Sequence, residues 1–91
     1  MKASVIIPLF NTFPAELECC LKSVAEQDLD SFEVIIVDDG SIYNEERARI
    51  LAEFNDGAKF RLLTHGENRG LSVARNTGLD EARGHYIVHL D

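Results

Sequence analysis

Two patterns of hydrophobic residues alternate along this chain. Short runs of β-branched and aliphatic residues, such as residues 34–37, recur between stretches whose apolar residues fall three or four positions apart. The runs are typical of strands buried on both faces, and the wider spacing is typical of amphipathic helices. The pattern predicts strands at residues 4–9, 32–37, 60–64 and 85–90, and helices at 16–27, 44–54 and 71–82.

This strict alternation of strands and helices predicts the fold class. Parallel strands joined by helices through right-handed crossovers form an α/β sheet that is covered on both faces. We expect a doubly wound, mostly parallel sheet in the order 3-2-1-4, with the switch point between the first and fourth strands. Because no repeat or linker interrupts the sequence, residues 1–91 are expected to form a single unit.

Polar residues gather where the predicted strands end. Residues 8–11 follow the first strand, 38–41 the second and 67–70 the third, and Asp91 ends the fourth. Open α/β sheets bind their ligands at the carboxyl ends of the strands, so this edge is the predicted ligand site. The two adjacent aspartates after the second strand repel each other unless a cation or a donor-rich ligand lies beside them. The pattern indicates a nucleotide or metal site.

Charge and cysteine usage narrow the choice of partners. The chain has 9 Lys and Arg against 16 Asp and Glu, a formal net charge of −7. Gripping nucleic acid requires clustered basic residues, so no nucleic-acid partner is expected. A nucleotide remains compatible, since a divalent cation bridges carboxylates and phosphates. Cys19 and Cys20 lack metal-site spacing, and the sequence contains no evident signal or membrane span; reduced thiols and a cytoplasmic location are expected.

Several familiar motifs are missing from the predicted ligand edge. The turn at residues 8–14 has no glycine, so it matches neither the dinucleotide-binding fingerprint nor the P-loop. Ser41 lacks the flanks of a nucleophile elbow. A receiver-like signalling domain also uses an acidic pair, but there the pair ends the first strand, not the second. That domain remains an alternative, as does a non-catalytic nucleotide-binding or interaction module.

Four sequence blocks in order resemble family 2 glycosyltransferases of the GT-A fold. They are SVIIPLFN at residues 4–11, VDDGS at 37–41, ENRG at 67–70 with ARNTG at 74–78, and YIVHLD at 86–91. The resemblance spans essentially the whole chain. It implies the Rossmann-like, nucleotide-sugar-binding N-terminal part of a GT-A transferase, truncated at the Asp-x-Asp motif.

The resemblance also implies roles for individual residues. Asp39 matches the carboxylate that accepts the N–H of uracil, and an ionised aspartate is an acceptor only. Pro8 and Phe10 match positions that flank the base, where an aromatic ring contributes roughly 1–3 kcal/mol of stacking. Asp91 matches the first acidic residue of the Asp-x-Asp motif, which contacts ribose and a divalent metal. The implied binding residues are Pro8, Phe10, Asp39, Asn68, Gly70, Arg75 and Asp91, with Asp91 as the metal ligand.

Structural roles compete with several of these assignments. Asp39 also suits a helix cap or a turn stabiliser, and Phe10 also suits core filling. Arg75 suits a contact to base or pyrophosphate and, equally, an ion pair with a neighbouring carboxylate. Asn11 is expected to form the turn rather than contact a ligand. None of the histidines is a good candidate base, and His89 is expected to lie half-buried on a core strand.

The implied activity is transfer of a hexose from a nucleoside diphosphate, most often a UDP-sugar, to an acceptor hydroxyl with inversion. Mn²⁺ or Mg²⁺ is the implied cofactor. The catalytic base and the site for a carbohydrate or lipid-linked acceptor are expected outside this chain, so no catalytic residue is assigned and the chain alone is expected to be inactive. The parent is compatible with membrane association. An uncovered edge on the fourth strand predicts self-association.

Overall fold

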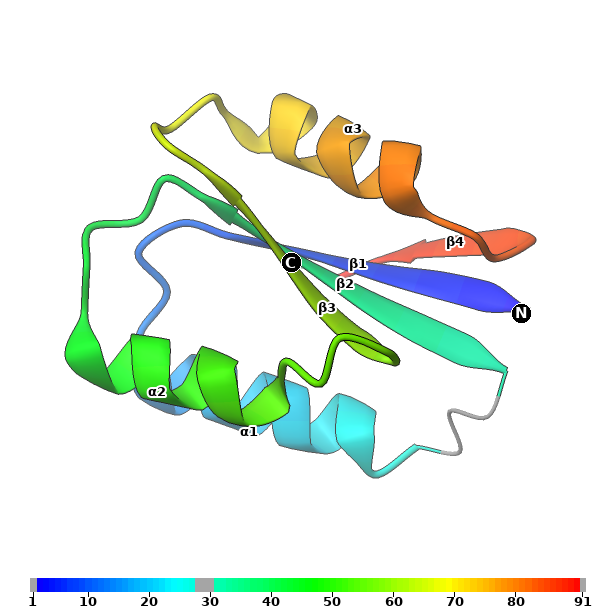
Figure 1. Ribbon diagram of the computed structural model, residues 1–91, viewed down its shortest axis with the longest axis horizontal. Coiled ribbons are helices and arrows are strands. Elements are labelled where there is room, and N and C mark those ends of the chain that lie inside the picture. The colour runs from blue at the N-terminus through cyan, green and yellow to red at the C-terminus, as the bar shows by residue number, and fades with distance from the viewer. Residues whose placement is uncertain (1, 28–30, 91) are drawn as a thin grey trace.

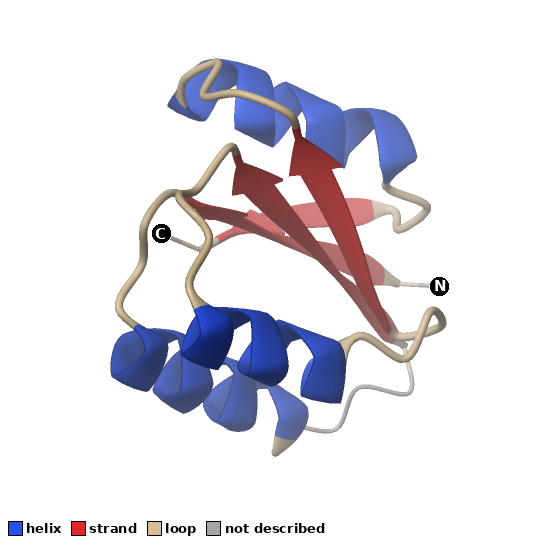
Figure 2. Ribbon diagram, turned by 60° about the vertical axis from the view of Figure 1, so that its left-hand side comes forward, coloured by secondary structure: helices blue, strands red, loops and turns tan. Residues whose placement is uncertain are grey.

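The computed structural model describes residues 2–27 and 31–90. Its four strands form one parallel sheet in the order β3-β2-β1-β4, which confirms the predicted fold class and strand order. Helices α1 and α2 cover one face of the sheet and α3 covers the other (Figures 1 and 2). The elements are β1 (Ala3–Leu9), α1 (Pro14–Ala25), β2 (Phe32–Asp39), α2 (Glu45–Phe54), β3 (Phe60–His65), α3 (Leu71–Glu81) and β4 (Tyr86–His89).

The two central strands are apolar on both faces because each face is covered by helices. Ile7 and Ile36 contribute to a larger core that includes Leu17 and Leu21 of α1 and Ile50 of α2. The opposite face holds a smaller core in which Ile35 and Val37 pack with Ala74 of α3. Burial of this kind stabilises a fold by about 25 cal/mol per Å² of apolar surface, so the central strands anchor the molecule.

Helix α3 lies close to the sheet because it presents small side chains to it. Ala74 and Gly78, one turn apart, are buried. A Cβ at Gly78 would lie 2.6 Å from Cγ2 of Ile6. The apolar stripe predicted for this helix also included Leu71, but its side chain is 51% exposed. Leu71 is the first residue of the helix and lies next to the ligand edge, where it lines a cavity instead of the core.

Strand β4 is an edge strand, and one sequence prediction fails there. It pairs with β1 through residues 86–89, and all four of its residues are exposed. The prediction that His89 is half-buried on a core strand was therefore wrong, since periodicity does not reveal whether a strand is central or lies at an edge. Self-association through this edge stays a prediction.

A buried polar network ties the amino ends of the strands together. Glu33 of β2 is 1% exposed. It accepts hydrogen bonds from Ser4 Oγ at 2.6 Å, from the backbone N–H of Arg83 at 2.6 Å and from Arg61 Nη2 at 2.9 Å. The backbone N–H of Gly84 donates to Ser4 Oγ at 2.9 Å. Burial tends to raise the pKa of Glu33. These hydrogen bonds and the Arg61 charge outweigh burial, so the pKa of Glu33 lies below its usual value.

No helix among residues 2–27 and 31–90 is long and apolar enough to cross a membrane.

Candidate functional site

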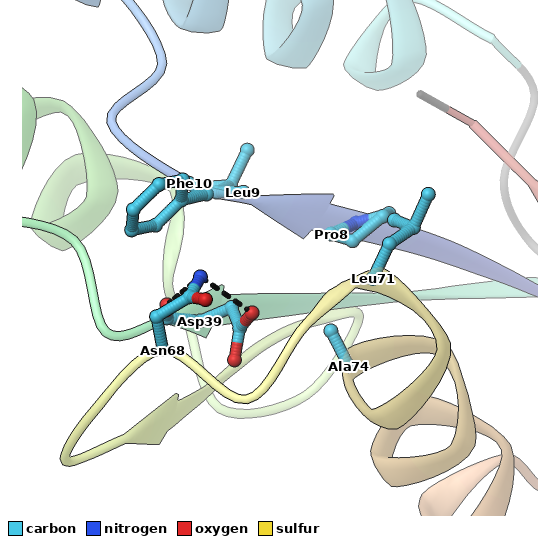
Figure 3. A pocket seen from close by; sticks show the side chains of 7 residues that line it. All are labelled: Pro8, Leu9, Phe10, Asp39, Asn68, Leu71 and Ala74. Atoms are coloured by element: carbon cyan, nitrogen blue, oxygen red, sulfur yellow. Dashed lines mark hydrogen bonds between the residues drawn. The ribbon is translucent and has the colours of Figure 1, made fainter.

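A small cavity of about 180 Å³ opens at the carboxyl edge of the sheet. Figure 3 shows Leu9 and Phe10 on one side of it with Asp39 and Asn68 below them, and Pro8, Leu71 and Ala74 on the other side. Its walls are mostly apolar, and the polar groups come from Asp39 and Asn68. The lining residues are Pro8, Leu9, Phe10, Asp39, Asn68, Leu71 and Ala74.

Asp39 is the best-connected polar group of this edge, and its side chain is 4% exposed. Its Oδ1 lies 2.7 Å from Nδ1 of His65 and accepts the backbone N–H of Arg69 at 2.9 Å. Its Oδ2 accepts Nδ2 of Asn68 at 3.0 Å and the backbone N–H of Gly70 at 2.9 Å. A carboxylate has about four acceptor positions, so these four contacts use its full capacity.

These contacts hold Asp39 in its charged form. Burial tends to raise the pKa of Asp39. The hydrogen bonds from His65, Arg69 and Gly70, together with the charge of the His65 ring when it is protonated, outweigh burial, so the pKa of Asp39 lies below its usual value. The carboxylate also lies at the amino end of α3, where the helix dipole favours negative charge. At neutral pH the cavity therefore contains an ionised acceptor.

The loops that frame the cavity are joined by hydrogen bonds between side chains and backbone groups. Asn11 has a φ of 52°, and its Oδ1 accepts the N–H of Ile42 at 2.8 Å while its own N–H donates to Ser41 Oγ at 2.9 Å. Asn11 thus forms a turn, as the sequence predicted. Arg47, 7% exposed, donates from Nε to the carbonyl of Thr12 and from Nη1 to that of Ile42. These contacts join the loop after β1 to the loop after β2.

The residues proposed from the sequence fall into three groups. Pro8, Phe10, Asp39 and Asn68 line the cavity. Gly70, with a φ of 97°, is the N-cap of α3 and binds Asp39 through its backbone, and half-buried Arg75 follows Ala74 on the same helix. The third group is Asp91, which lies outside the described residues.

Sequence reasoning missed two contributors to this site. Leu71 lines the cavity although its helical spacing suggested a core position. His65 contacts Asp39 although it was dismissed as a candidate base. A signal for His65 was present: it ends β3 directly opposite Asp39 in the parallel register, so both side chains point to the same face.

Metal binding was also predicted at this edge. Within residues 2–27 and 31–90, no group of three His, Cys, Asp or Glu side chains could hold a metal ion. The predicted metal ligand, Asp91, lies outside that part of the chain. The described residues provide a cavity of about 180 Å³ that contains an ionised acceptor.

Comparison with known proteins decides the family. The profile of glycosyl transferase family 2 matches residues 4–91. The chain belongs to this family. It is part of a family 2 glycosyltransferase, with the fold of the N-terminal part of GT-A enzymes.

Curated relatives within the family are bacterial glycosyltransferases. The chain is 42% identical over 91 residues to the uncharacterized glycosyltransferase YibD of Escherichia coli and 40% identical over 90 residues to EpsJ of Bacillus subtilis, covering 99% and 97% of this chain. It is 37% identical over 90 residues, 99% of this chain, to glycosyltransferase GlyA of Streptococcus pneumoniae. The match spans 25% of the length of YibD and EpsJ and 12% of GlyA.

Two solved structures match the fold closely. TarS of S. aureus, residues 1–349 in complex with UDP-GlcNAc, aligns with a TM-score of 0.81 and 31% identity, covering 100% of this chain and 26% of that one. A mannosyltransferase of Pyrobaculum calidifontis in complex with GDP-mannose and Mn²⁺ aligns with a TM-score of 0.79 and 26% identity, covering 94% of this chain and 26% of that one. These relatives bind nucleotide-sugars.

Proposed function

We propose that the chain forms the UDP-sugar-binding part of an inverting hexosyltransferase whose catalytic base and acceptor site lie elsewhere in the parent protein. The observation that carries this proposal is the apolar cavity at the carboxyl edge, with an ionised, buried Asp39 at its floor. The family match and the UDP-GlcNAc complex of TarS support the choice of ligand class. The chain alone is expected not to transfer sugar.

The cavity suits the base rather than the whole sugar nucleotide. Pockets for drug-sized ligands measure about 300–1,000 Å³, whereas this cavity measures about 180 Å³. Phe10 is 52% exposed and presents its ring at the cavity, where it can stack on a planar base. Uracil carries an imide N–H between two carbonyl groups. Asp39 can accept that N–H, and the Asn68 carboxamide can donate to an adjacent carbonyl.

A ligand N–H must displace one of the donors that already bind Asp39. The N–H groups of Arg69 and Gly70 belong to the backbone, and His65 is enclosed, with a side chain 6% exposed. Asn68 is an exposed residue whose Nδ2 contacts Oδ2 of Asp39 at 3.0 Å and the Asp39 carbonyl at 3.3 Å (Figure 3). Asn68 is therefore the replaceable donor. When uracil enters, the Asn68 amide releases Asp39 Oδ2 and donates to the base, and the imide N–H of uracil takes its place on Asp39.

The remaining assignments extend this proposal along the nucleotide. Gly70 leaves its backbone open beside the cavity, since a Cβ there would have no atom within 4 Å. Its φ of 97° is the feature that requires glycine at this position. Arg75 would bind the base or the pyrophosphate. Asp91 would contact the ribose and the Mn²⁺ or Mg²⁺ of the parent enzyme, whose chemistry is to stabilise the departing diphosphate.

Calorimetric titration with UDP and CDP tests the proposal. Cytosine has an acceptor where uracil has its imide N–H, so UDP is expected to bind roughly tenfold or more tightly than CDP. Phe10→Ala is expected to weaken UDP binding roughly 5- to 150-fold through lost stacking. The matched control is Phe13→Ala, since Phe13 is 70% exposed and does not line the cavity.

Two results would count against the uracil site. Equal affinities for UDP and CDP would show that Asp39 does not read the imide. Equal losses in the Phe10 and Phe13 variants would show that the cavity does not hold the base. A folded chain that binds neither nucleotide would contradict the proposal for this chain altogether.

A further inference from the structure

His65 connects the ligand edge to helix α3 through both of its ring nitrogens. Nδ1 lies 2.7 Å from Oδ1 of Asp39, and Nε2 lies 2.8 Å from Oγ1 of Thr77. The Thr77 hydroxyl in turn lies 3.0 Å from the carbonyl of Val73 on the same helix. The His65 side chain is 6% exposed, so these contacts are made away from bulk water. A continuous chain of contacts thus runs from the cavity carboxylate to the backbone of α3.

Proton positions along this chain of contacts are constrained. Asp39 is ionised and can only accept, so Nδ1 of His65 must carry a proton. Thr77 has one hydroxyl proton, which is given either to Nε2 of His65 or to the Val73 carbonyl. In the first case His65 is neutral, and in the second it is an imidazolium that donates to both neighbours. In both cases His65 donates to Oδ1 of Asp39.

This donation helps to fix the plane of the Asp39 carboxylate relative to the ligand. Oδ1 is held by His65 and by the N–H of Arg69. Oδ2 is bound by Asn68, the replaceable donor, and by the N–H of Gly70. Without His65, Oδ1 would keep only the Arg69 N–H, and the plane of the carboxylate could tilt away from the orientation in which Oδ2 faces the base.

We propose that His65 is a positioning residue of the nucleotide site: it locks the Asp39 carboxylate so that Oδ2 faces the base, and through Thr77 it ties that orientation to α3. This inference rests on the proposed uracil site. It assigns to His65 the selection of uracil over cytosine, a role distinct from catalysis or from direct contact with the ligand.

Replacing His65 with asparagine or glutamine tests its contacts with Asp39 and with Thr77 separately. Asn places its Nδ2 where histidine has Nδ1, so His65→Asn keeps the donor to Asp39 and loses the contact with Thr77. Gln reaches the position of Nε2, so His65→Gln keeps the Thr77 side and loses the donor to Asp39. His65→Leu removes both, and Thr77→Val removes the far contact alone.

Two readouts are measured on each variant. The first is the ratio of the UDP and CDP dissociation constants by calorimetry. The second is the hydrogen-exchange rate of the Arg69 and Gly70 amides, which donate to Asp39 and report its position without any ligand. In His65→Leu and His65→Gln, the preference for UDP is expected to fall roughly tenfold and the exchange of both amides to rise by a similar factor. His65→Asn and Thr77→Val both keep a donor to Asp39 and lose the Thr77 contact, so each is expected to stay within about threefold of the parent values.

The outcomes distinguish this inference from the proposed function. Unchanged amide exchange in a folded His65→Leu variant would overturn the positioning role, whatever the affinity for UDP. Equal loss of UDP and CDP binding, with no rescue by asparagine, would reduce His65 to a packing residue and also overturn it. Altered exchange that asparagine rescues, in a chain that binds no nucleotide, would uphold the positioning of Asp39 and overturn both the uracil site and the selectivity assigned to His65.

Discussion

Replacing Glu33 with alanine is expected to lower the free energy of unfolding by about 3–5 kcal/mol, the usual cost of removing one partner from a buried ion pair. The carboxylate is 1% exposed and accepts three hydrogen bonds. Its loss leaves the Ser4 hydroxyl, the Arg83 N–H and the Arg61 guanidinium without their acceptor in a buried region. Urea denaturation at neutral pH measures the change through the transition midpoint.

Glu81→Ala is the matched control for this substitution. Glu81 also contacts Arg61, at 3.7 Å, but its side chain is 52% exposed. Exposed ion pairs contribute about 0–1 kcal/mol, so this variant is expected to remain close to the parent. Similar losses in the Glu33 and Glu81 variants would contradict the structural role of the buried network.

The second large effect is expected at Gly40, where alanine should destabilise the fold and weaken nucleotide binding together. Gly40 has a φ of 72°, and a Cβ there would lie 2.3 Å from the carbonyl carbon of Glu67 and 2.4 Å from the nitrogen of Asn68. Both are backbone atoms, so the loop after β3 must shift. That loop carries the Arg69 and Gly70 donors to Asp39. Urea denaturation and UDP calorimetry measure the two consequences.

Gly57→Ala separates backbone strain from the clash. Gly57 has a similar φ of 74°, but a Cβ there meets nothing within 4 Å. Its replacement is expected to cost about 1–2 kcal/mol from the left-handed conformation alone, with no effect on UDP binding. Gly40→Ala should cost about 1–3 kcal/mol more, as overpacking does. Equal stabilities of the two variants, or normal UDP binding by Gly40→Ala, would show that the two loops do not pack as described.

Much of the fold could be predicted because its signals are local. The apolar runs of β1 and β2 identify central strands, and strict alternation with helices leaves few topologies. The acidic pair at residues 38–39 and the turn at residues 8–11 mark the carboxyl edge without any long-range information. The resemblance to family 2 glycosyltransferases then named Pro8, Phe10, Asp39 and Asn68 as binding residues, and these four line one cavity.

The contacts that organise the site could not be predicted, because they join residues distant in sequence. Glu33 stands in an apolar run, and its partners lie 28 to 50 residues away. Asp39 and His65 are 26 residues apart and meet only through the register of β2 and β3. That register also extends β2 to Asp39, two residues beyond the predicted strand. Arg47 is buried on a helix face that the pattern assigned to apolar residues, since two loop carbonyls bind its guanidinium.

A titration of the ¹⁵N-labelled chain with UDP, followed by heteronuclear NMR, tests the central claim most directly. The account predicts that the shifted signals cluster at the carboxyl edge: the amides of Phe10, Arg69 and Gly70 and the side-chain amide of Asn68. The amides of Arg83 and Gly84, at the opposite edge, serve as internal controls and should not move. Shifts confined to the opposite edge, or saturable binding that leaves Asn68 and Gly70 unchanged, would contradict a nucleotide site built around Asp39.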